Sequence, residues 1–290
     1  MLADDPVPEV SVVLPAYQAA AWVGAAVREV RAAFAPPPGE ALPPAREAPP
    51  AQCSVGAAGV GAVGVGAVGG EAAGVEIVVV DDGSTDGTTA AAVAAGADLV
   101  VTLDSNAGKG AAVRAGMLAA RGRVRIFTDV DLAYPPSQLP ALVAALADGA
   151  DVVVGNRRHR DTRRINSAPR ARAVASRLFN LGARVVLLGR HRDTQCGLKA
   201  FTAPAARHIF ARTAVDGFAF DVEVLYLAEA AGMKVVDAPV VLDHVEETTV
   251  ALVPSAFAVL RDLLGIRRRI AAGGYDAPAS TPATAPGPAR

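Results

Sequence analysis

The chain has 290 residues, of which 52% are hydrophobic, enough for one large α/β domain or two smaller ones. Lys and Arg number 28 against 29 Asp and Glu, so the net charge of -1 excludes a general attraction to nucleic acid or anionic lipid. Two cysteines, Cys53 and Cys196, exclude a disulfide framework, and no Cys or His cluster indicates a structural zinc site. Because the acidic N-terminus lacks the apolar segment of a signal peptide, we expect a reduced, cytoplasmic protein.

Strands and helices alternate through the first half of the chain. We predict buried strands where short β-branched runs end in turn residues, and helices in the Ala-rich stretches between them. The predicted strands are 10–14 (stopped by Pro15), 75–80, 98–102, 124–128 and 151–155, and the predicted helices are 19–34, 88–95, 111–120 and 136–147. This alternation is typical of a doubly wound, mostly parallel sheet, whose ligands bind at the carboxyl ends of the strands.

Residues 36–74 interrupt this alternation. Within them, residues 49–70 carry no charge and are long enough to cross a bilayer. However, Val55–Gly70 contains only Gly, Ala and Val, which bury little apolar area and are costly to hold helical. A membrane crossing here would also separate two strands of one sheet. We therefore predict a mobile insertion.

The second half of the chain has a different pattern. Residues 157–172 carry seven arginines opposed only by Asp161. A helix over 168–188 follows, with its apolar residues on one face. Further predicted strands are 198–201, 234–236 and 240–242, and further predicted helices are 220–231 and 254–269. Residues 271–290, rich in Ala, Pro and Gly, read as a disordered tail, which leaves 1–270 as one domain.

Two carboxylates, Asp129 and Asp131, follow the predicted strand 124–128. In an extended chain, residues two apart point to the same side, so both could reach one hard divalent cation. Mg²⁺ held in this way keeps open positions for phosphate oxygens. The alternative is a solvated strand end with two incidental acids.

Two further polar loops follow strands. Asp81-Asp82-Gly83-Ser84 could cap a turn, or a carboxylate there could accept an N–H group from a pyrimidine base. Gly108-Lys109-Gly110 at a helix start offers backbone N–H groups and a cation to a phosphate. No P-loop motif and no G-x-G-x-x-G after the first strand is present, which counts against an NTPase or a dehydrogenase.

Together these segments resemble the successive motifs of family 2 glycosyltransferases, which have the GT-A fold. The matching segments are Val12–Tyr17, Val78–Thr88, Asn106–Gly110 and Asp129–Asp131. Asp193–Phe201 and Phe220–Tyr226 are similar to the branch of dolichyl-phosphate β-glucosyltransferases and related polyprenyl-phosphate sugar transferases. The resemblance covers residues 9–270 apart from the insertion. It implies one GT-A domain, with a nucleotide-sugar-binding half over 9–155 and an acceptor half over 156–270.

The resemblance also implies roles for single residues on the donor side. The expected nucleotide-sugar contacts are Pro15, Ala16, Tyr17, Asp82, Gly108, Lys109, Asp129, Gln195, Cys196 and Gly197. Of these, the first three would flank the nucleoside and Asp82 would recognise uracil. Asp129 and Asp131 would hold the diphosphate through Mg²⁺ or Mn²⁺, which acts as Lewis acid and template.

On the acceptor side, the resemblance implies that Asp221 faces the reacting centre as a base or an orienting group. For a lipid-phosphate acceptor, Arg172 and Arg177 would be the anion clamps, since guanidinium groups match phosphate geometry; the alternative is that the arginine run is a solvated loop. The expected reaction is inverting, metal-dependent transfer of a hexose from a UDP-sugar to a polyprenyl phosphate, with glucose as the favoured hexose. Helix 168–188 would then lie on the inner membrane face, or else pack against the sheet.

Three alternatives stay open. The acceptor could be a soluble hydroxyl compound, with Asp221 as general base. A sugar-1-phosphate nucleotidyltransferase also uses paired aspartates, but needs a Gly-rich loop with Arg and Lys after the first strand, and none occurs. A nucleotide-sugar-binding protein without catalysis is the third. Two departures from the family pattern, at Gln18-Ala19 and at 244–249, bear on donor and acceptor identity, and Asp243 or His244 could complete a metal shell.

Overall fold

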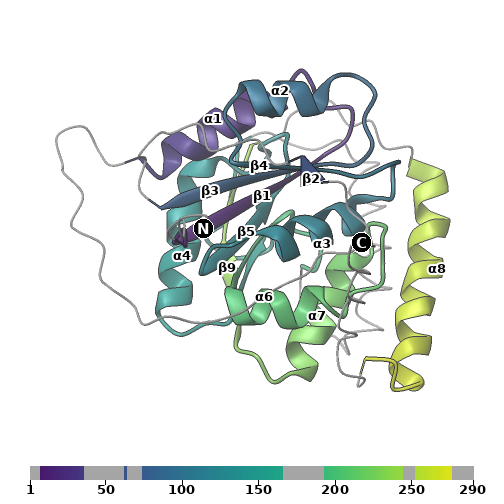
Figure 1. Ribbon diagram of the computed structural model, residues 1–290. Helices are drawn as coiled ribbons and strands as arrows, with labels where there is room; N and C mark the ends of the chain where they lie inside the picture. Colours follow the sequence, from purple (N-terminus) through teal and green to yellow (C-terminus); the bar gives the residue numbers. More distant parts are fainter. Residues whose placement is uncertain (1–6, 36–61, 64–73, 166–192, 244–251, 276–290) are drawn as a thin grey trace, which may run out of the picture.

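The computed structural model describes residues 7–35, 62–63, 74–165, 193–243 and 252–275. Within these residues an eight-stranded sheet, in the order β2-β4-β3-β1-β5-β8-β6-β9, lies between two layers of helices (Figure 1). β8 runs antiparallel to β5 and β6, and β2 runs antiparallel to β4, whereas the other neighbours are parallel. The predicted doubly wound, mostly parallel sheet is confirmed.

The strands of this sheet are β1 (Val10–Ala16), β2 (Ala62–Val63), β3 (Val75–Asp81), β4 (Leu99–Thr102), β5 (Val124–Thr128), β6 (Val152–Asn156), β8 (Leu198–Thr202) and β9 (Val235–Pro239). A separate parallel pair joins β7 (Arg163–Arg164) to β10 (Val241–Leu242). The helices are α1 (Val23–Ala33), α2 (Thr88–Ala94), α3 (Lys109–Ala119), the 3₁₀ turn η1 (Pro136–Gln138), α4 (Leu139–Ala147), α6 (Ala203–Phe210), α7 (Phe220–Ala230) and α8 (Leu252–Ala271).

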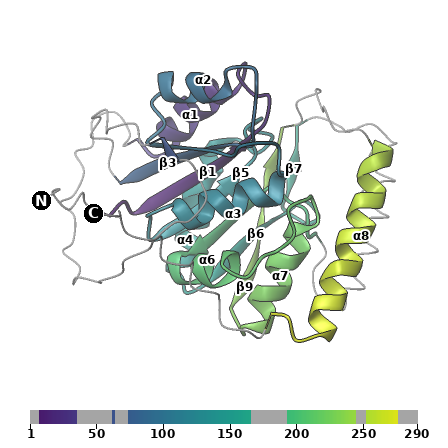
Figure 2. The same ribbon diagram turned by 45° about the vertical axis from the view of Figure 1, so that its right-hand side comes forward.

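Alternating side chains divide the core into two layers. Along β1, Val12 and Leu14 face the helices α1, α2 and α4, whereas Val13 faces α3, α6 and α7. The neighbouring strands β3 and β5 alternate in the same way, as expected for strands covered on both faces. α8 stands beside α7 at one side of the molecule in both views (Figures 1 and 2), and its Leu263 and Ile266 are buried in the second of these layers.

β1 continues past Pro15, which we predicted to end it. The strand runs to Ala16, and Pro15 pairs with Val80 of β3. On the other side of β1 the pairing with β5 ends at Val13 opposite Phe127. The missing N–H group of proline therefore costs no ladder hydrogen bond at this point.

Three predictions for the less regular parts of the chain need correction. α6 was missed, because the apolar residues of 203–210 are mostly alanine and follow a strand without a break. Ala62–Val63 of the predicted mobile insertion pair with β4 as an edge strand. Residues 271–275, assigned to a disordered tail, complete α8 and its turn, and Tyr275 is buried.

The predicted helix 168–188 lies outside the described residues. No helix in the described part of the chain combines the length and apolar character needed to cross a bilayer.

The strand order reverses at β1, since β3 and β4 lie on one side of it and β5 lies on the other. Loops that leave the carboxyl ends of β1 and β5 must diverge here. In doubly wound sheets this divergence opens the crevice in which ligands bind. The polar loops after β1, β3 and β5 all end at this edge.

Candidate active site

Asp129 and Asp131 stand at the carboxyl end of β5, in a turn and not in an extended chain. The backbone N–H of Leu132 donates to the carbonyl of Asp129 at 3.1 Å, and Leu132 has a φ of 51°. The extended geometry from which we predicted that the two carboxylates share one side is therefore wrong. Asp129 is partly buried, whereas Asp131 is exposed and its Oδ1 accepts the N–H of Ala133 at 3.0 Å.

Lys109, the first residue of α3, brings three aspartates together. Its Nζ lies 2.5 Å from Oδ1 of Asp129. Burial alone would lower the pKa of Lys109, but the charges of Asp129, Asp221 and Asp131 outweigh burial and raise that pKa above its usual value. Because such charge interactions require proximity, the turn after β5 and the start of α7 meet around one lysine.

The start of α3 is held by a protein carbonyl. The N–H groups of Gly110 and Ala111 donate to the carbonyl of Asp216 at 2.7 and 3.3 Å. We predicted that the N–H groups of Gly108-Lys109-Gly110 would receive a phosphate, and this is wrong for Gly110, because its N–H already donates to Asp216. Gly108 has a φ of 106°, and a Cβ added there would lie 2.6 Å from the same carbonyl, so the close approach requires glycine.

Asp82 joins the end of β3 to the loop before α3. Its Oδ1 accepts the N–H of Ala107 at 2.7 Å, and its Oδ2 accepts the N–H of Gly108 at 2.9 Å. Burial raises the pKa of Asp82, against the effect of these two donors. Each carboxylate oxygen has a second lone pair, so recognition of uracil by Asp82 stays a prediction. The capped-turn alternative describes Asp81, which accepts the N–H of Ser84 at 2.9 Å.

The loop after β3 also fixes the segment after β1, a contact that our sequence reasoning missed. The hydroxyl of Ser84 accepts the N–H of Gln18 at 2.8 Å, and that of Thr88 accepts the N–H of Ala19 at 2.8 Å. The signal was the group of hydroxyl and carboxyl side chains over 84–88, which is interrupted only by Gly87. Next to this anchored segment Tyr17 is 49% exposed, while Pro15 and Ala16 are buried. Tyr17 is thus the predicted nucleoside contact whose side chain is open to a ligand.

Asp221 is buried at the start of α7 and paired with a buried lysine. Nζ of Lys199 lies 2.5 Å from Oδ1 of Asp221 and donates to the carbonyl of Cys196 at 2.8 Å. The same ammonium lies 5.3 Å from the ring centre of Phe127. Burial raises the pKa of Asp221, while Lys199 and Lys109 act in the opposite direction. The motif had drawn attention to Asp221, but nothing in it indicated that Lys199 of β8 would pair with it.

Gln195, Cys196 and Gly197 lie directly before β8, beside the turn after β5. A Cβ added to Gly197 would overlap Oδ2 of Asp129, so this glycine allows the two segments to touch. Gln195 is partly exposed. Cys196 is fully buried, and burial raises the pKa of its thiol to about 11, so it is a packed residue and not a nucleophile. Any contact of Cys196 with a ligand would come through its backbone.

A buried ion pair that the sequence did not reveal supports this segment. Arg157 donates from Nε and Nη2 to the two oxygens of Asp193, at 2.8 and 2.7 Å. Burial alone would raise the pKa of Asp193, but Arg157 outweighs it and holds that pKa below the usual value. Arg157 is therefore structural, unlike the solvated loop that we considered for the arginine run. The predicted phosphate clamps Arg172 and Arg177 lie outside the described residues.

The donor set at this edge fits a hard divalent cation bound together with a diphosphate. In the described part of the chain no group of three or more His, Cys, Asp or Glu side chains could hold a metal ion. Asp243 donates its N–H to the carbonyl of Ala133 at 2.9 Å but does not complete such a group, and His244 is outside the described residues. The protein share is therefore the carboxylates of Asp129 and Asp131, which leaves the remaining positions of Mg²⁺ or Mn²⁺ to phosphate oxygens and water.

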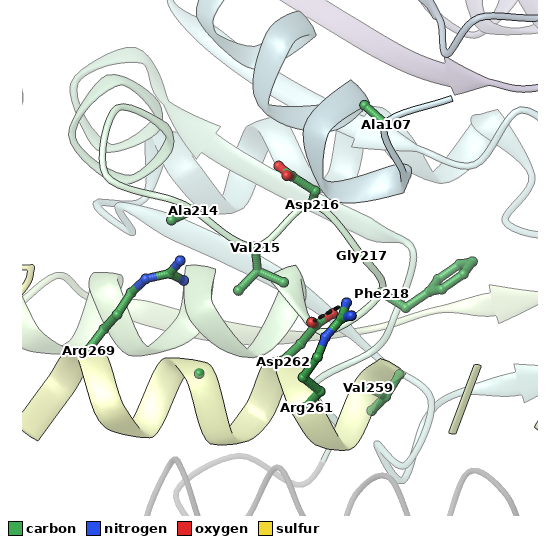
Figure 3. A pocket seen from close by; sticks show the side chains of 11 residues that line it. Ala107, Ala214, Val215, Asp216, Gly217, Phe218, Val259, Arg261, Asp262 and Arg269 are labelled. Carbon is green, nitrogen blue, oxygen red and sulfur yellow. Dashed lines mark hydrogen bonds and ion pairs between the residues drawn. The ribbon is translucent and has the colours of Figure 1, made fainter. Parts of the chain in front are cut away.

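A cavity of about 700 Å³ lies on the other side of the loop that precedes α7, between this loop and α8 (Figure 3). Val215, Gly217 and Phe218 line it from the loop, and Arg261 and Arg269 line it from α8. Asp216 also lines it, whereas Asp129, Asp131, Asp221, Lys109 and Lys199 do not. The loop thus forms a wall between this cavity and the charged residues at the carboxyl edge.

Comparison with known proteins identifies the class. Residues 71–210 match the sequence model of Glycosyl transferase family 2. The chain belongs to this family, and its fold is that of the GT-A glycosyltransferases. The predicted family and fold are confirmed.

Within the family, the chain is similar in sequence to curated dolichyl-phosphate beta-glucosyltransferases. The chain is 39% identical over 166 residues to the dolichyl-phosphate beta-glucosyltransferase of Drosophila melanogaster, covering 53% of this chain and 51% of the relative. It is 32% identical over 212 residues to the Homo sapiens protein of the same name, covering 69% and 65%. The chain thus spans between about half and two thirds of the length of these curated relatives.

Among solved structures, a similar fold occurs in glucosyl-3-phosphoglycerate synthase from Mycobacterium tuberculosis in complex with Mn²⁺, UDP-glucose and phosphoglyceric acid. The TM-score is 0.59 at 20% identity, over 94% of this chain and 82% of that one. At this level of identity the likeness shows the fold alone.

Proposed function

We propose that the protein is an inverting glycosyltransferase that moves a hexose from a UDP-sugar to a polyprenyl phosphate. Glucose is the hexose that we favour. The observation that carries the proposal is the meeting of Asp129, Asp131 and Asp221 around Lys109 at the carboxyl edge of the sheet. The names of the curated relatives, dolichyl-phosphate beta-glucosyltransferases, support the sugar and the acceptor class. Membership of family 2 argues against the nucleotidyltransferase alternative.

The donor would lie across the loops after β1 and β3. Tyr17 offers an exposed ring to the nucleoside, and Asp82 offers carboxylate lone pairs to an N–H group of uracil. In relation to the diphosphate, Asp129 and Asp131 would hold Mg²⁺ or Mn²⁺, which when bound neutralises charge on the leaving UDP. Lys109 adds a fixed positive charge at the same place and orients the carboxylate of Asp129.

The pairing of Asp221 favours an acceptor that arrives ionised. A general base must take up a proton from an attacking hydroxyl group, but protonation of Asp221 would leave the buried ammonium of Lys199 without its counter-charge. A phosphate monoester needs no base at neutral pH, since its second pKa is about 6. We therefore assign Asp221 an orienting role and place the negative charge of the nucleophile on the acceptor phosphate.

The donor assignment is tested by thermal unfolding with UDP-glucose and GDP-mannose, each with and without Mn²⁺. A ligand at a hundredfold excess over its Kd stabilises the folded state by about 2.7 kcal/mol. We expect UDP-glucose with Mn²⁺ to raise the melting temperature, and Asp131→Ala to remove this rise. Stabilisation by GDP-mannose alone would reject the UDP-sugar assignment.

The acceptor assignment is tested by transfer of labelled glucose from UDP-glucose. A short-chain prenyl phosphate is compared with the matching prenyl alcohol and with small soluble alcohols. We expect product with the phosphate alone, and analysis of its anomeric configuration should give the β linkage of an inverting enzyme. Product with the alcohols and none with the phosphate would establish the hydroxyl-acceptor alternative instead.

The proposed acceptor also suggests where in the cell the protein works. A polyprenyl chain resides in a bilayer, so we propose that the protein works at the membrane surface, on the cytoplasmic face. Fractionation of cells expressing the full chain should place it with membranes at low salt. Complete recovery in the soluble fraction at every salt concentration would contradict this placement.

A further inference from the structure

Glu223 is a buried carboxylate that the proposed chemistry does not use. It lies two residues beyond Asp221 in α7 and is fully buried. Its oxygens accept the N–H of Ala214 at 3.0 Å, the N–H of Val215 at 2.9 Å, and the hydroxyl of Tyr275 at 2.5 Å. Glu223 therefore joins three segments: the loop before α7, α7 itself and the turn that follows α8.

The loop that Glu223 holds is the one that anchors the start of α3. Directly after Val215, the carbonyl of Asp216 receives the N–H groups of Gly110 and Ala111. The side chain of Asp216 is paired in turn with Arg114 of α3 at 2.7 Å. Lys109 stands at this same helix start and contacts Asp129. A chain of short contacts thus runs from the end of α8 to the charged cluster.

The cavity explains why these hydrogen bonds matter. Figure 3 shows Val215, Asp216 and Gly217 on the wall of the hollow that faces α8. Val215 is buried against α8, but the cavity removes part of the close packing that fixes most protein interiors from this side of the loop. Its position then depends on hydrogen bonds at its ends, and buried hydrogen bonds to a charged group are among the stronger ones.

We infer that Glu223 is a positioning residue for the donor site, and that Tyr275 links α8 to that site through it. Glu223 fixes the loop 213–217, the loop fixes the start of α3, and α3 presents Lys109 to Asp129. The same arrangement makes Tyr275, in the turn that follows α8, part of the machinery that binds the donor, which no motif in the sequence indicated. The effect on donor binding rests on the proposed function, whereas the effect on the loop does not.

The first test follows backbone hydrogen exchange in the full chain. In Glu223→Ala we expect faster exchange at 213–217 and also at Gly110 and Ala111, which lie on a different element. In Tyr275→Phe, which keeps the ring, we expect the same pattern at smaller amplitude. The matched control is Glu76→Ala, another buried carboxylate with hydroxyl and N–H donors, at the opposite end of the sheet. There exchange should rise near 121–122 and not at 110–111.

Glu223→Gln separates hydrogen bonding from general damage. Its amide oxygen can accept from Ala214 and Val215, and its NH₂ group can donate to Tyr275. We expect protection at Gly110 and Ala111 to survive in Glu223→Gln. Equal loss of protection in the Gln and Ala variants, or unchanged protection at 110–111 in both Glu223→Ala and Tyr275→Phe, would overturn the inference.

The second test measures kinetics with UDP-glucose at a temperature where each variant is folded. We expect KM for the donor to rise roughly tenfold in Glu223→Ala, and less than threefold in Glu223→Gln, since a positioning loss of this kind corresponds to about 1.4 kcal/mol. Glu76→Ala should lower the melting temperature without raising KM. A lower melting temperature with unchanged KM in Glu223→Ala would reduce Glu223 to a structural residue. If the wild type binds no UDP-sugar, the proposed function fails while the exchange test still decides the inference.

Discussion

The two ends of the central sheet both carry buried charge, but they use it differently. At the amino end, Glu76 accepts the hydroxyl of Ser11 at 2.5 Å and both the N–H and the Nε–H of Arg121, at 2.8 and 2.7 Å. The hydroxyl of Ser11 accepts the N–H of Gly122 in turn, and Arg125 donates to the carbonyl of Met117 at 2.6 Å. Nearly every polar group there is satisfied by another protein group.

At the carboxyl end, the arrangement leaves capacity for a ligand. Asp131 is exposed, and Asp129 and Asp221 share their surroundings with two lysines. The hydroxyls of Thr128 and Thr194, which precede Asp129 and Gln195, are buried and have no hydrogen-bond partner among the described residues. Satisfied networks stabilise a fold, whereas incompletely satisfied ones mark the places where function is carried. The contrast can be tested at both ends of one sheet.

Removal of one carboxylate at each end should give the largest difference. We expect Asp131→Ala to lower kcat/KM for transfer by about a thousandfold, because a loss of roughly 4 kcal/mol of charge stabilisation corresponds to that factor. Its melting temperature without ligand should stay near that of the wild type, since Asp131 is exposed. Glu76→Ala should do the reverse and lower stability while leaving kcat/KM per folded molecule unchanged. A large fall in activity for both variants would contradict the claim that only the carboxyl end of the sheet carries function.

The pair of Lys199 and Asp221 combines features of both ends, since it is buried and paired yet belongs to the catalytic edge. We expect Lys199→Met to lower the free energy of unfolding by about 3–5 kcal/mol, because it leaves a buried carboxylate without its counter-charge. The double variant Lys199→Met with Asp221→Asn should recover most of this loss. Urea unfolding measures the free energy of unfolding of the single and of the double variant. If the double variant is no more stable than the single one, the ion pair is not what Lys199 contributes.

Contact between the segment before β8 and the turn after β5 gives the next largest effect. In Gly197→Ala the added methyl group would overlap Oδ2 of Asp129 and displace this carboxylate from Lys109. We expect a fall in kcat/KM of about a hundredfold, which is typical for a displacement of about 1 Å at a reacting site.

Gly265→Ala in α8 is the control for that substitution. A Cβ there meets nothing within 4 Å, and alanine favours a helix over glycine by up to about 1 kcal/mol. It should keep full activity and unfold at the same or a higher denaturant concentration. Full activity of Gly197→Ala would show that the position of Asp129 is not critical.

The sequence predicted the ends of strands better than the contacts between them. β3, β4 and β5 lie where their β-branched runs placed them, and the polar residues after them meet at one edge, because parallel strands end on the same side. The pairing of Lys199 with Asp221, and that of Arg157 with Asp193, join residues 22 and 36 positions apart across antiparallel β8. Local pattern carries no information on such pairings. The motif around Phe220–Tyr226 pointed to Asp221, but the fold alone shows that Glu223 beside it holds a loop.

At residues 271–275 the sequence led us to predict disorder where the structure is ordered. Residues 271–275 read as a tail from their Ala and Gly content, because composition reports only how much apolar area a segment could bury. One side chain, Tyr275, packs against Tyr226 with ring centres 5.6 Å apart and donates to Glu223. A single buried aromatic residue with a satisfied hydroxyl therefore orders a segment that its composition would leave disordered.

The smallest predicted effect concerns Asp82 and pH. Burial raises the pKa of Asp82 in the folded protein above the 3.8 of the unfolded chain. The folded state then binds the proton more tightly, so the stability from Asp82 is fully present below pH 3.8 and is lost as the pH rises through the folded pKa. The difference in unfolding free energy between the wild type and Asp82→Asn should therefore decline as the pH rises above 3.8. Recognition of uracil requires the carboxylate, so the affinity of the wild type for UDP should change in the opposite direction and increase over the same interval. A pH-independent difference in stability would show that the N–H donors of Ala107 and Gly108 cancel the effect of burial on Asp82, and a difference that increases with pH would show that these donors dominate.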